Sequence, residues 1–296
     1  MTGPRPSRAV VVGATGQVGR TAVTALRSDG WEVVGTHHRR PARHTLATPP
    51  NAAGWARMLT DHPASAVVIA AALTDVDRCE DDPAVSRSVN VDLVDRVVRA
   101  AADHGAHVVH LSTDYVFDGT GGPYTERDPV RPINVYGRHK AESEQLILDH
   151  GGAVLRTSVV YGGSREGAVD HVAARLRQGP AAFSTEHFAT PTWAPDLAWL
   201  VTRTVRERCG GIVHAAGPDH VSRHGLAIAI AQAAGLDPDR VLDSATTGAS
   251  SARAPRPARC GLVVARAQEL LGYRPAPLAE GLRRHFSGTG GHSSRR

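Results

Sequence analysis

The sequence predicts an α/β fold, a doubly wound parallel Rossmann sheet with a smaller C-terminal α/β lobe. A short apolar strand at residues 8–12 leads into a glycine-rich turn and then a helix. Short apolar strands alternate with helical patterns as far as residue 160, as expected for right-handed βαβ units in a parallel sheet. Beyond residue 160 the alternation loosens, and we expect a second, smaller lobe there.

The composition is that of an ordinary globular protein. The 296 residues are 41% hydrophobic and 21% charged, with a net charge of +5. Basic and acidic residues are interspersed, which argues against nucleic-acid binding. The longest apolar run, residues 66–73, is too short to cross a membrane. Cys79, Cys209 and Cys260 lack metal-ligand spacing and favour a reducing compartment, so we expect a cytoplasmic protein.

The glycine-rich turn after the first strand predicts a dinucleotide site. Gly13 permits the tight turn, Gly16 lets a pyrophosphate approach the backbone, and Gly19 lets the helix pack close to the strand. The following helix presents free N–H groups to that phosphate. The alternative is a glycine turn without a ligand. The cofactor-binding residues expected here are Gly13, Thr15, Gly16, Gln17, Val18 and Gly19.

The second strand, residues 31–35, bears on the choice of cofactor. An NAD site normally has an acidic residue here for the adenosine ribose, and none is present. His37 and His38 are followed by Arg39 and Arg40, which would favour a 2′-phosphate. We therefore expect NADPH, with NADH as the other cofactor that the site could use. The alternative is that the two arginines are only solvated loop residues.

The next elements bring further polar and small residues to the same edge of the sheet. A buried strand at residues 66–72 ends in Ala70, Ala71 and Ala72, whose small side chains would let a cofactor lie close. A helix is expected over residues 83–103, then a strand at 107–111 that leads into Ser112-Thr-Asp-Tyr-Val-Phe-Asp-Gly119. A helix from about residue 136 to 149 precedes a strand at 153–156.

Tyr136 and Lys140 are four residues apart on this expected helix, and therefore on one face of it. Lys140 is the only lysine in a chain with 34 Lys and Arg residues. Arginine stays charged near neutrality, whereas the pKa of a lysine can be tuned, so this pairing favours chemistry. The alternative is a tyrosine that happens to precede a surface lysine.

The C-terminal part is less regular. We expect helices at residues 169–177, 223–234 and 264–271. Residues 189–198 are expected to open a further helix that runs to about residue 206. Residues 211–215 are a strand that could return to the first sheet or belong to a second one. Residues 246–259 are expected to be an exposed loop, and the tail 287–296 to be disordered. The expected division is a dinucleotide-binding domain at 1–160, completed by parts of 186–217, and a lobe at 161–286.

With these residues assembled, the chain resembles an extended short-chain dehydrogenase/reductase, and most closely the dTDP-4-dehydrorhamnose reductase family. The Gly-X-X-Gly-X-X-Gly spacing is the version found in short-chain dehydrogenases. The most specific pair of motifs is STDYVFDG with YGRHKAE. The matching pieces are GATGQVG (13–19), AALTDVDRCEDDP (71–83), VN (89–90), STDYVFDG (112–119), PINVYGRHKAE (132–142), RTSVVYG (156–162) and PTWAPDLA (191–198).

The resemblance implies a catalytic triad of Thr113, Tyr136 and Lys140. Reduction of a ketone leaves charge on an oxygen that must be protonated, and an unperturbed tyrosine is a weak acid near neutral pH. A neighbouring ammonium would lower the pKa of Tyr136. Lys140 would supply it and would also bind the nicotinamide ribose, and Thr113 would donate to the substrate oxygen.

The resemblance also implies a sugar pocket, which the lobe at 161–286 would help to form. The expected substrate-binding residues are Thr74, Asp75, Asp114, Tyr115, Val116, Phe117, Asn134 and Trp193. For Tyr115, Phe117 and Trp193, packing in the core is the alternative. The family often has an acidic metal ligand just after the glycine turn, where this chain has Arg20 and Thr21, so we expect no metal. A homodimer is one assembly that the resemblance allows.

Three functions are compatible with these motifs. The first is NADPH-dependent reduction of the 4-keto group of a nucleotide-activated 4-keto-6-deoxy sugar, dTDP-linked by resemblance. The second is a non-catalytic regulatory subunit that binds NADP, since such a subunit of methionine adenosyltransferase resembles this family. The third is a reductase of a non-sugar carbonyl in specialised metabolism.

Overall fold

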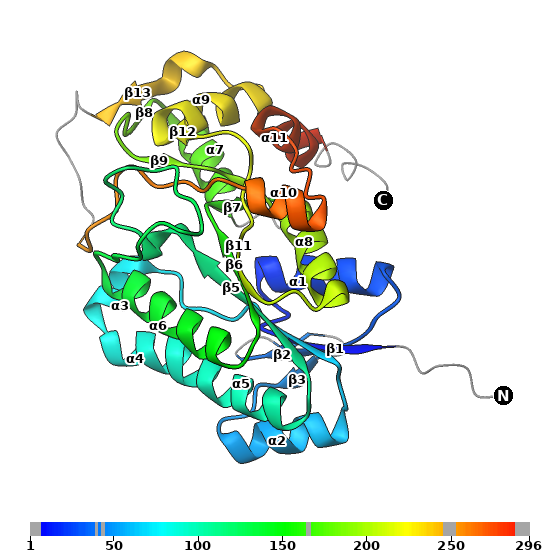
Figure 1. The fold of residues 1–296 in the computed structure, drawn as a ribbon. Coiled ribbons are helices and arrows are strands. Elements are labelled where there is room, and N and C mark those ends of the chain that lie inside the picture. Colours follow the sequence, from blue (N-terminus) through cyan, green and yellow to red (C-terminus); the bar gives the residue numbers. More distant parts are fainter. Residues whose placement is uncertain (1–6, 39–40, 43–44, 164–166, 245–252, 288–296) are drawn as a thin grey trace.

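The computed structural model describes residues 7–38, 41–42, 45–163, 167–244 and 253–287. Seven parallel strands form one sheet in the order β11-β6-β5-β4-β1-β2-β3 (Figure 1). The strands are β1 (Arg8–Val12), β2 (Glu32–His37), β3 (Thr45–Ala47), β4 (Ala66–Ile69), β5 (His107–Thr113), β6 (Ala153–Thr157) and β11 (Gly211–His214). The predicted doubly wound parallel sheet is confirmed.

The order of the strands reverses between β1 and β4. Chain connections run outward from β1 through β2 to β3 on one side, and from β4 through β5 to β6 on the other. In open α/β sheets, ligands bind beyond the carboxyl ends of the strands at such a reversal. The glycine turn follows β1 and residues 70–72 follow β4, so both lie at this point.

Helices cover both faces of the sheet, and each face has its own apolar core. On one face, β-strand side chains pack with α1 (Gln17–Ser28), α8 (Ala194–Glu207) and α10 (Ala265–Leu271). On the other face they pack with α2 (Ala52–Asp61), α5 (Leu93–Asp103) and α6 (Val135–Asp149). The strands between them are nearly continuous runs of buried valine and alanine, as expected for strands covered on both faces.

The expected helix over residues 83–103 is divided into three parts. These are α4 (Pro83–Arg87), a π-helical turn η1 (Ser88–Asp92) and α5. Asn90 lies in the π turn, is almost fully buried, and bonds both backbone groups of Leu73 at 2.9 and 3.0 Å. The helix therefore fixes the loop after β4. Periodicity did not predict the short elements β3, α2, α3 (Val76–Asp81) and α11 (Leu278–Ser287).

The smaller lobe lies at one end of the sheet, at the top of Figure 1. Its helices are α7 (Ala168–Gln178), α9 (Arg223–Ala233) and α11, with a short η3 (Pro238–Arg240). Three two-stranded pairs complete it: β7 (Val160–Tyr161) with β10 (Thr192–Trp193), β8 (Ala181–Phe183) with β13 (Val241–Asp243), and β9 (Phe188–Ala189) with β12 (Val221–Ser222). The strand at 211–214 instead belongs to the main sheet, beside β6.

The segment expected to be an exposed loop at 246–259 is partly buried. Residues 246–252 lie outside the described residues, as does most of the expected disordered tail. In the described part, Ala254 is almost fully buried, and the backbone N–H groups of Arg253 and Ala254 donate to Asp77 on α3 at 3.1 and 2.9 Å. The composition suggested a solvated loop because these contacts come from residues far away in the sequence.

None of the described helices is long and apolar enough to cross a membrane. The three cysteines are free.

Candidate active site

The glycine turn is packed directly against the end of β4. Gly13 has φ +81°, which favours glycine, and a Cβ placed on it would lie 2.8 Å from the Cα of Ala71. A Cβ on Gly19 would lie 2.1 Å from the carbonyl oxygen of Gly13, so helix α1 reaches this close to the turn only because residue 19 is glycine. Gly13, Gly19 and Ala71 therefore form one close-packed junction at the reversal of the sheet.

The start of α1 has the features that a phosphate group requires. Gly16 occupies the N-cap position, is exposed, and no side chain caps the helix. No acidic residue lies in the first turn, so the free N–H groups and the positive end of the helix dipole are open to an anion. The side chain of Gln17 is committed elsewhere, since its Nε2 donates to the carbonyl of Gly162 at 2.7 Å. Gln17 would therefore contribute mainly through its backbone, and cofactor contacts of Thr15 and Val18 stay a prediction.

Two glycine substitutions separate packing from cofactor binding. Gly19→Ala is expected to destabilise the protein by about 1–3 kcal/mol because the new methyl group collides with the Gly13 carbonyl. Gly16→Ala meets its first neighbour only at 3.5 Å, so its stability is expected to stay near wild type while NADPH affinity falls. Urea unfolding and fluorescence titration with NADPH measure the two effects, and equal stability of both variants would contradict this packing.

The adenosine end of the expected cofactor site lies at the end of β2. His37 bonds the Thr45 hydroxyl at 2.7 Å through Nδ1, which ties β2 to β3, and His38 is exposed just beyond it. Arg39 and Arg40 lie outside the described residues. A role for Arg39 and Arg40 in selecting NADPH stays a prediction.

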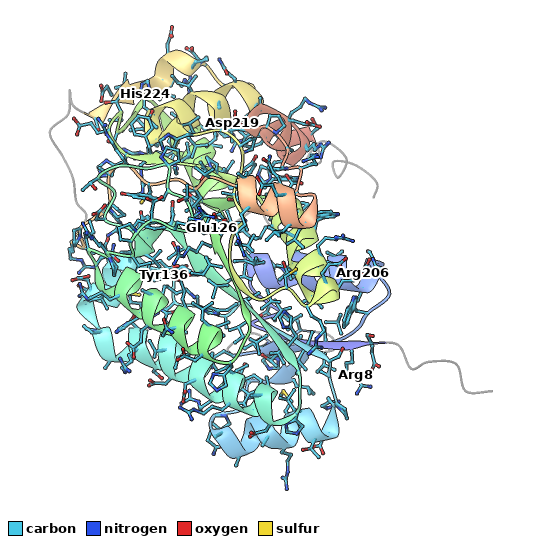
Figure 2. All side chains as sticks on the ribbon, in the orientation of Figure 1. Arg8, Glu126, Tyr136, Arg206, Asp219 and His224 are labelled. Carbon is cyan, nitrogen blue, oxygen red and sulfur yellow. The ribbon has the colours of Figure 1, made fainter. Side chains whose placement is uncertain are left out.

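Thr113 and Tyr136 meet where the carboxyl end of β5 faces the start of α6. The Thr113 side chain lies close enough to the Tyr136 phenol to act on it, and it acts to lower the pKa of the phenol. Burial acts in the opposite direction and is stronger, so the pKa of Tyr136 lies well above its usual value. Tyr136 is labelled on α6 in Figure 2. At neutral pH the phenol of Tyr136 therefore keeps its proton, and it lies beside Thr113.

The start of α6 is fixed by its own local contacts. Asn134 is fully buried and caps the helix, since its Oδ1 accepts from the Gly137 N–H at 2.8 Å. A Cβ at Gly137 would lie 2.2 Å from the Tyr115 carbonyl oxygen, so glycine lets α6 approach the turn after β5. Asn134 also donates to the Pro255 carbonyl at 2.9 Å. The oxygen and the nitrogen of the Asn134 amide are thus both used to fix the start of α6, which argues against a direct contact between Asn134 and a substrate.

Lys140 lies one helical turn after Tyr136 and is 1% exposed. Its Nζ donates to the Leu111 carbonyl at 2.7 Å and lies 2.8 Å from His110 Nε2, both on β5. Burial lowers the pKa of Lys140 to about 7, and Glu144 opposes this shift. The sequence predicted that Lys140 would lower the pKa of Tyr136. In the structure its ammonium is directed to His110 and Leu111, and burial dominates at the phenol.

A buried ion pair that the sequence analysis missed lies below the lysine. Glu144, one turn further along α6, receives Arg156 Nη2 at 2.7 Å and Nε at 3.0 Å, and the Ser112 hydroxyl at 2.5 Å. Both charged side chains are nearly inaccessible, at 1% for Arg156 and 4% for Glu144. Two features of the sequence could have indicated this pair. Lys140 and Glu144 are four residues apart on one helix, and Arg156 is a charged residue in an otherwise apolar strand.

The comparisons with known proteins place this chain in a family. The model described as the RmlD substrate binding domain matches residues 7–289. The chain belongs to this family.

Two curated relatives have different roles by name. A dTDP-4-dehydrorhamnose reductase of Mycobacterium tuberculosis is 35% identical over 267 residues, covering 86% of this chain and 83% of the relative. Methionine adenosyltransferase 2 subunit beta of Bos taurus is 29% identical over 262 residues, covering 83% and 78%. The RmlD-family assignment therefore leaves the specific activity open.

Solved structures show the same fold. A hypothetical dTDP-4-dehydrorhamnose reductase from Sulfolobus tokodaii is 29% identical with a TM-score of 0.83, over 93% of this chain and 98% of that one. A Bacillus anthracis dTDP-4-dehydrorhamnose reductase in complex with NADP has 23% identity and a TM-score of 0.84, over 96% and 99%. MoeE5 in complex with UDP-glucuronic acid and NAD has 25% identity and a TM-score of 0.82, over 96% and 99%. Structural relatives thus bind NADP or NAD.

The expected substrate residues of this RmlD-family chain divide into two groups. Tyr115 lies edge-on to Tyr136, with ring centroids 6.2 Å apart, and its hydroxyl accepts from Arg223 Nη2 at 3.2 Å. Asp114 lies beside Thr113 and accepts from the Ser158 hydroxyl at 2.6 Å, and burial raises its pKa to about 6. Arg223, at the start of α9, was not predicted and brings the smaller lobe to the site.

Most of the other expected substrate residues make structural contacts. Val116 and Phe117 are fully buried in the main core, where Phe117 stacks on Tyr124 with centroids 4.2 Å apart. Trp193 packs on Tyr161 in the smaller lobe. Thr74 and Asp75 are exposed, and Asp75 caps α3 by accepting from the Arg78 N–H at 3.1 Å. The contacts of Phe117 and Trp193 agree with packing in the core, the alternative to substrate binding named for both residues.

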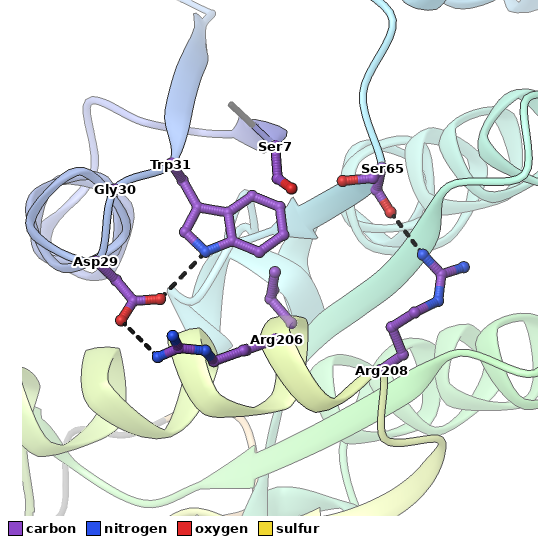
Figure 3. Close-up of a pocket in the computed structure, with 8 residues that line it drawn as sticks. Ser7, Asp29, Gly30, Trp31, Ser65, Arg206 and Arg208 are labelled. Atoms are coloured by element: carbon purple, nitrogen blue, oxygen red, sulfur yellow. Dashed lines mark hydrogen bonds and ion pairs between the residues drawn. The ribbon is translucent and has the colours of Figure 1, made fainter. Parts of the chain in front are cut away.

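A surface hollow of about 430 Å³ lies away from this site. It is formed at the amino ends of β1, β2 and β4 and at the end of α8. This is the edge of the sheet opposite the glycine turn. In Figure 2, Arg8 and Arg206, which mark this edge, lie far from Tyr136. Asp29 accepts from Arg206 at 3.0 Å and from Trp31 at 3.3 Å, and Arg208 donates to the Ser65 carbonyl at 3.2 Å (Figure 3). The polar groups that line this hollow thus largely make hydrogen bonds and ion pairs with one another. Within the described residues, no group of three or more His, Cys, Asp or Glu side chains could hold a metal ion.

Proposed function

We propose that this chain is an NADPH-dependent reductase of the 4-keto group of a nucleotide-activated 4-keto-6-deoxy sugar, dTDP-linked in the first instance. The observation that carries the proposal is the placement of the Thr113 side chain beside the Tyr136 phenol, with the buried Lys140 one helical turn further along α6. Thr113 ends β5, and Tyr136 and Lys140 lie on the face of α6 that meets this strand. The glycine turn follows β1, at the same edge of the sheet as Thr113.

The residues divide the reaction between them. A bound nicotinamide supplies the hydride for the carbonyl carbon. The Tyr136 phenol donates its proton to the carbonyl oxygen, where negative charge develops, and the Thr113 hydroxyl orients that oxygen. The Lys140 ammonium stabilises the phenolate that remains. An ammonium has three N–H donors, so the acceptors on His110 and Leu111 leave one for the cofactor ribose.

The choice of substrate rests on the relatives and on charge. The 35% identical mycobacterial relative is named a dTDP-4-dehydrorhamnose reductase. Arg223 beside Tyr115 would favour an anionic substrate such as a sugar nucleotide. NADPH is favoured by the absence of an acidic residue at the end of β2 and by Arg39 and Arg40 in the sequence.

A second candidate is a non-catalytic subunit that binds NADP and assembles with another enzyme. The observation in its favour is the 29% identity to methionine adenosyltransferase 2 subunit beta. A protein that only binds a partner does not require a buried lysine beside a buried phenol, so we rank this candidate second. Co-purification with a larger enzyme, together with no reduction of any sugar nucleotide, would favour it.

The rate of reduction is expected to depend on pH through Lys140. Its pKa is lowered to about 7, so the ammonium is lost as the pH rises above that value. The pKa of Tyr136 is raised, so the phenol keeps its proton throughout this range. We therefore expect kcat/KM for ketone reduction to be high below pH about 7 and to fall above it. A profile that is flat from pH 6 to 9 would contradict the requirement for the ammonium.

A further inference from the structure

We propose that His110 is a positioning residue that holds the Lys140 ammonium toward the active site, by accepting a hydrogen bond from Nζ on its Nε2 atom. The contact itself is structural, and its effect on catalysis rests on the function proposed above.

The two side chains are enclosed together. His110 lies in the middle of β5 with no exposed surface, and Lys140 Nζ lies 2.8 Å from its Nε2. The Leu111 carbonyl is the second acceptor of the ammonium, at 2.7 Å. A flexible lysine chain is thus bound at two points on one strand, and its remaining N–H is directed by them.

The ring can accept this hydrogen bond if Nε2 carries no proton. Burial and the nearby Lys140 charge hold the pKa of His110 well below its usual value, so the ring is neutral. Nδ1 makes no hydrogen bond of ordinary geometry among the described residues, although the Ile69 carbonyl on β4 favours a proton on the ring. The neighbouring Ser143 hydroxyl lies 3.0 Å from Nε2 and donates to the Lys140 carbonyl at 2.8 Å. With the proton on Nδ1, the single lone pair of Nε2 accepts from Lys140, and the Ser143 hydroxyl, whose proton goes to the Lys140 carbonyl, lies beside Nε2 without a hydrogen bond to it.

The other charged groups around Lys140 do not replace His110. Strand β6 contributes Arg156, which is bound by Glu144 of α6, and α5 presents apolar side chains to α6. The titratable groups next to Lys140 are His110 on β5 and Glu144 on α6. Asp114, Tyr115 and Cys79 act on Tyr136, one turn away. On the remaining packed elements, Glu80 of α3 accepts from the Val135 N–H, and His139 of α6 bonds Ser86 of α4.

A single lysine makes the contact measurable without an activity assay. Protein grown with [13Cε]lysine gives one side-chain signal, and its pH titration reports the pKa of Lys140 alone. A hydrogen bond to the charged form favours that form. His110→Leu removes the acceptor, and we expect the pKa of Lys140 to fall by about one unit, the size expected for losing one hydrogen bond to a charged group.

Two variants provide the controls. His110→Gln offers an amide oxygen as acceptor and is expected to restore the titration of Lys140 toward wild type. His107→Gln, at the start of the same strand, is expected to leave it unchanged. With active protein, the upper limb of the kcat/KM profile should move to lower pH in His110→Leu and return in His110→Gln. Equal loss of rate at all pH values would indicate a role in stability only.

An unchanged or raised Lys140 pKa in a folded His110→Leu variant would overturn the proposal. If that variant does not fold, 15N-histidine spectra of the wild-type protein decide instead, with the His110 signal assigned by its loss in His110→Gln. An unprotonated Nε2 supports the proposal, and a proton on Nε2 overturns it. If no sugar nucleotide is reduced by wild-type protein, the proposed function fails, while the lysine titration still decides the role of His110.

Discussion

Tyr136→Phe is expected to lower the turnover of ketone reduction at least about a hundredfold, because it removes the proton donor and leaves the ring in place. The substituted ring keeps its contacts with Tyr115 and with the buried cluster around Ala254, so the fold and the affinity for NADPH are expected to stay close to wild type. Steady-state kinetics, with NADPH binding followed separately, distinguish lost chemistry from lost binding.

Tyr273→Phe is the matched control. Tyr273 is also buried, lies against Trp199 away from Tyr136, and its hydroxyl makes no hydrogen bond among the described residues. Its variant is expected to keep full turnover. Unchanged turnover in Tyr136→Phe would exclude the phenol as the acid.

Glu144→Gln is expected to destabilise the protein by about 3 kcal/mol or more, the largest loss of stability that we expect from a single substitution. It leaves the Arg156 guanidinium buried without a counter-charge, and breaking one side of a buried ion pair costs about 3–5 kcal/mol. Denaturant unfolding monitored by circular dichroism measures the change.

Glu142→Gln, on the same helix, is the control for this effect. Glu142 pairs with Arg87 at 2.6 Å, but both side chains are more than 40% exposed, so little change in stability is expected. The double variant Glu144→Leu with Arg156→Met removes both charges and is expected to recover part of the loss. Equal effects of Glu142→Gln and Glu144→Gln would contradict the importance of burial.

Local patterns in the sequence were sufficient to predict the parallel sheet and six of its strands, but not β3 or the sheet to which β11 belongs. The spacing of Gly13, Gly16 and Gly19 between a strand and a helix predicted a close junction, and the structure packs Gly13 and Gly19 against backbone. The spacing of Tyr136 and Lys140 predicted one helical face, and both side chains lie on the face of α6 that meets β5. These features depend on residues within one or two neighbouring elements, so they can be predicted from hydrophobic periodicity and from the spacing of residues along the chain.

Contacts between distant segments were not predictable in this way. Asp77 on α3 binds the segment at 253–256, so an apparently solvated loop is partly buried next to Tyr136. The pairing of Glu144 with Arg156, and of Lys140 with His110, depends on which residues of a strand face a helix. Single charged or polar residues in apolar strands were the only signal, and their partners become known only once the strands are in register.

The measurement that tests the central claim most directly is NADPH oxidation by the purified protein with a dTDP-linked 4-keto-6-deoxy sugar. We expect oxidation only when the sugar nucleotide is present, with formation of the corresponding alcohol, and a slower reaction with NADH. A panel that includes UDP- and GDP-linked 4-keto sugars identifies the nucleotide. Binding of NADPH without oxidation on any member of this panel would contradict the assignment as a sugar-nucleotide reductase.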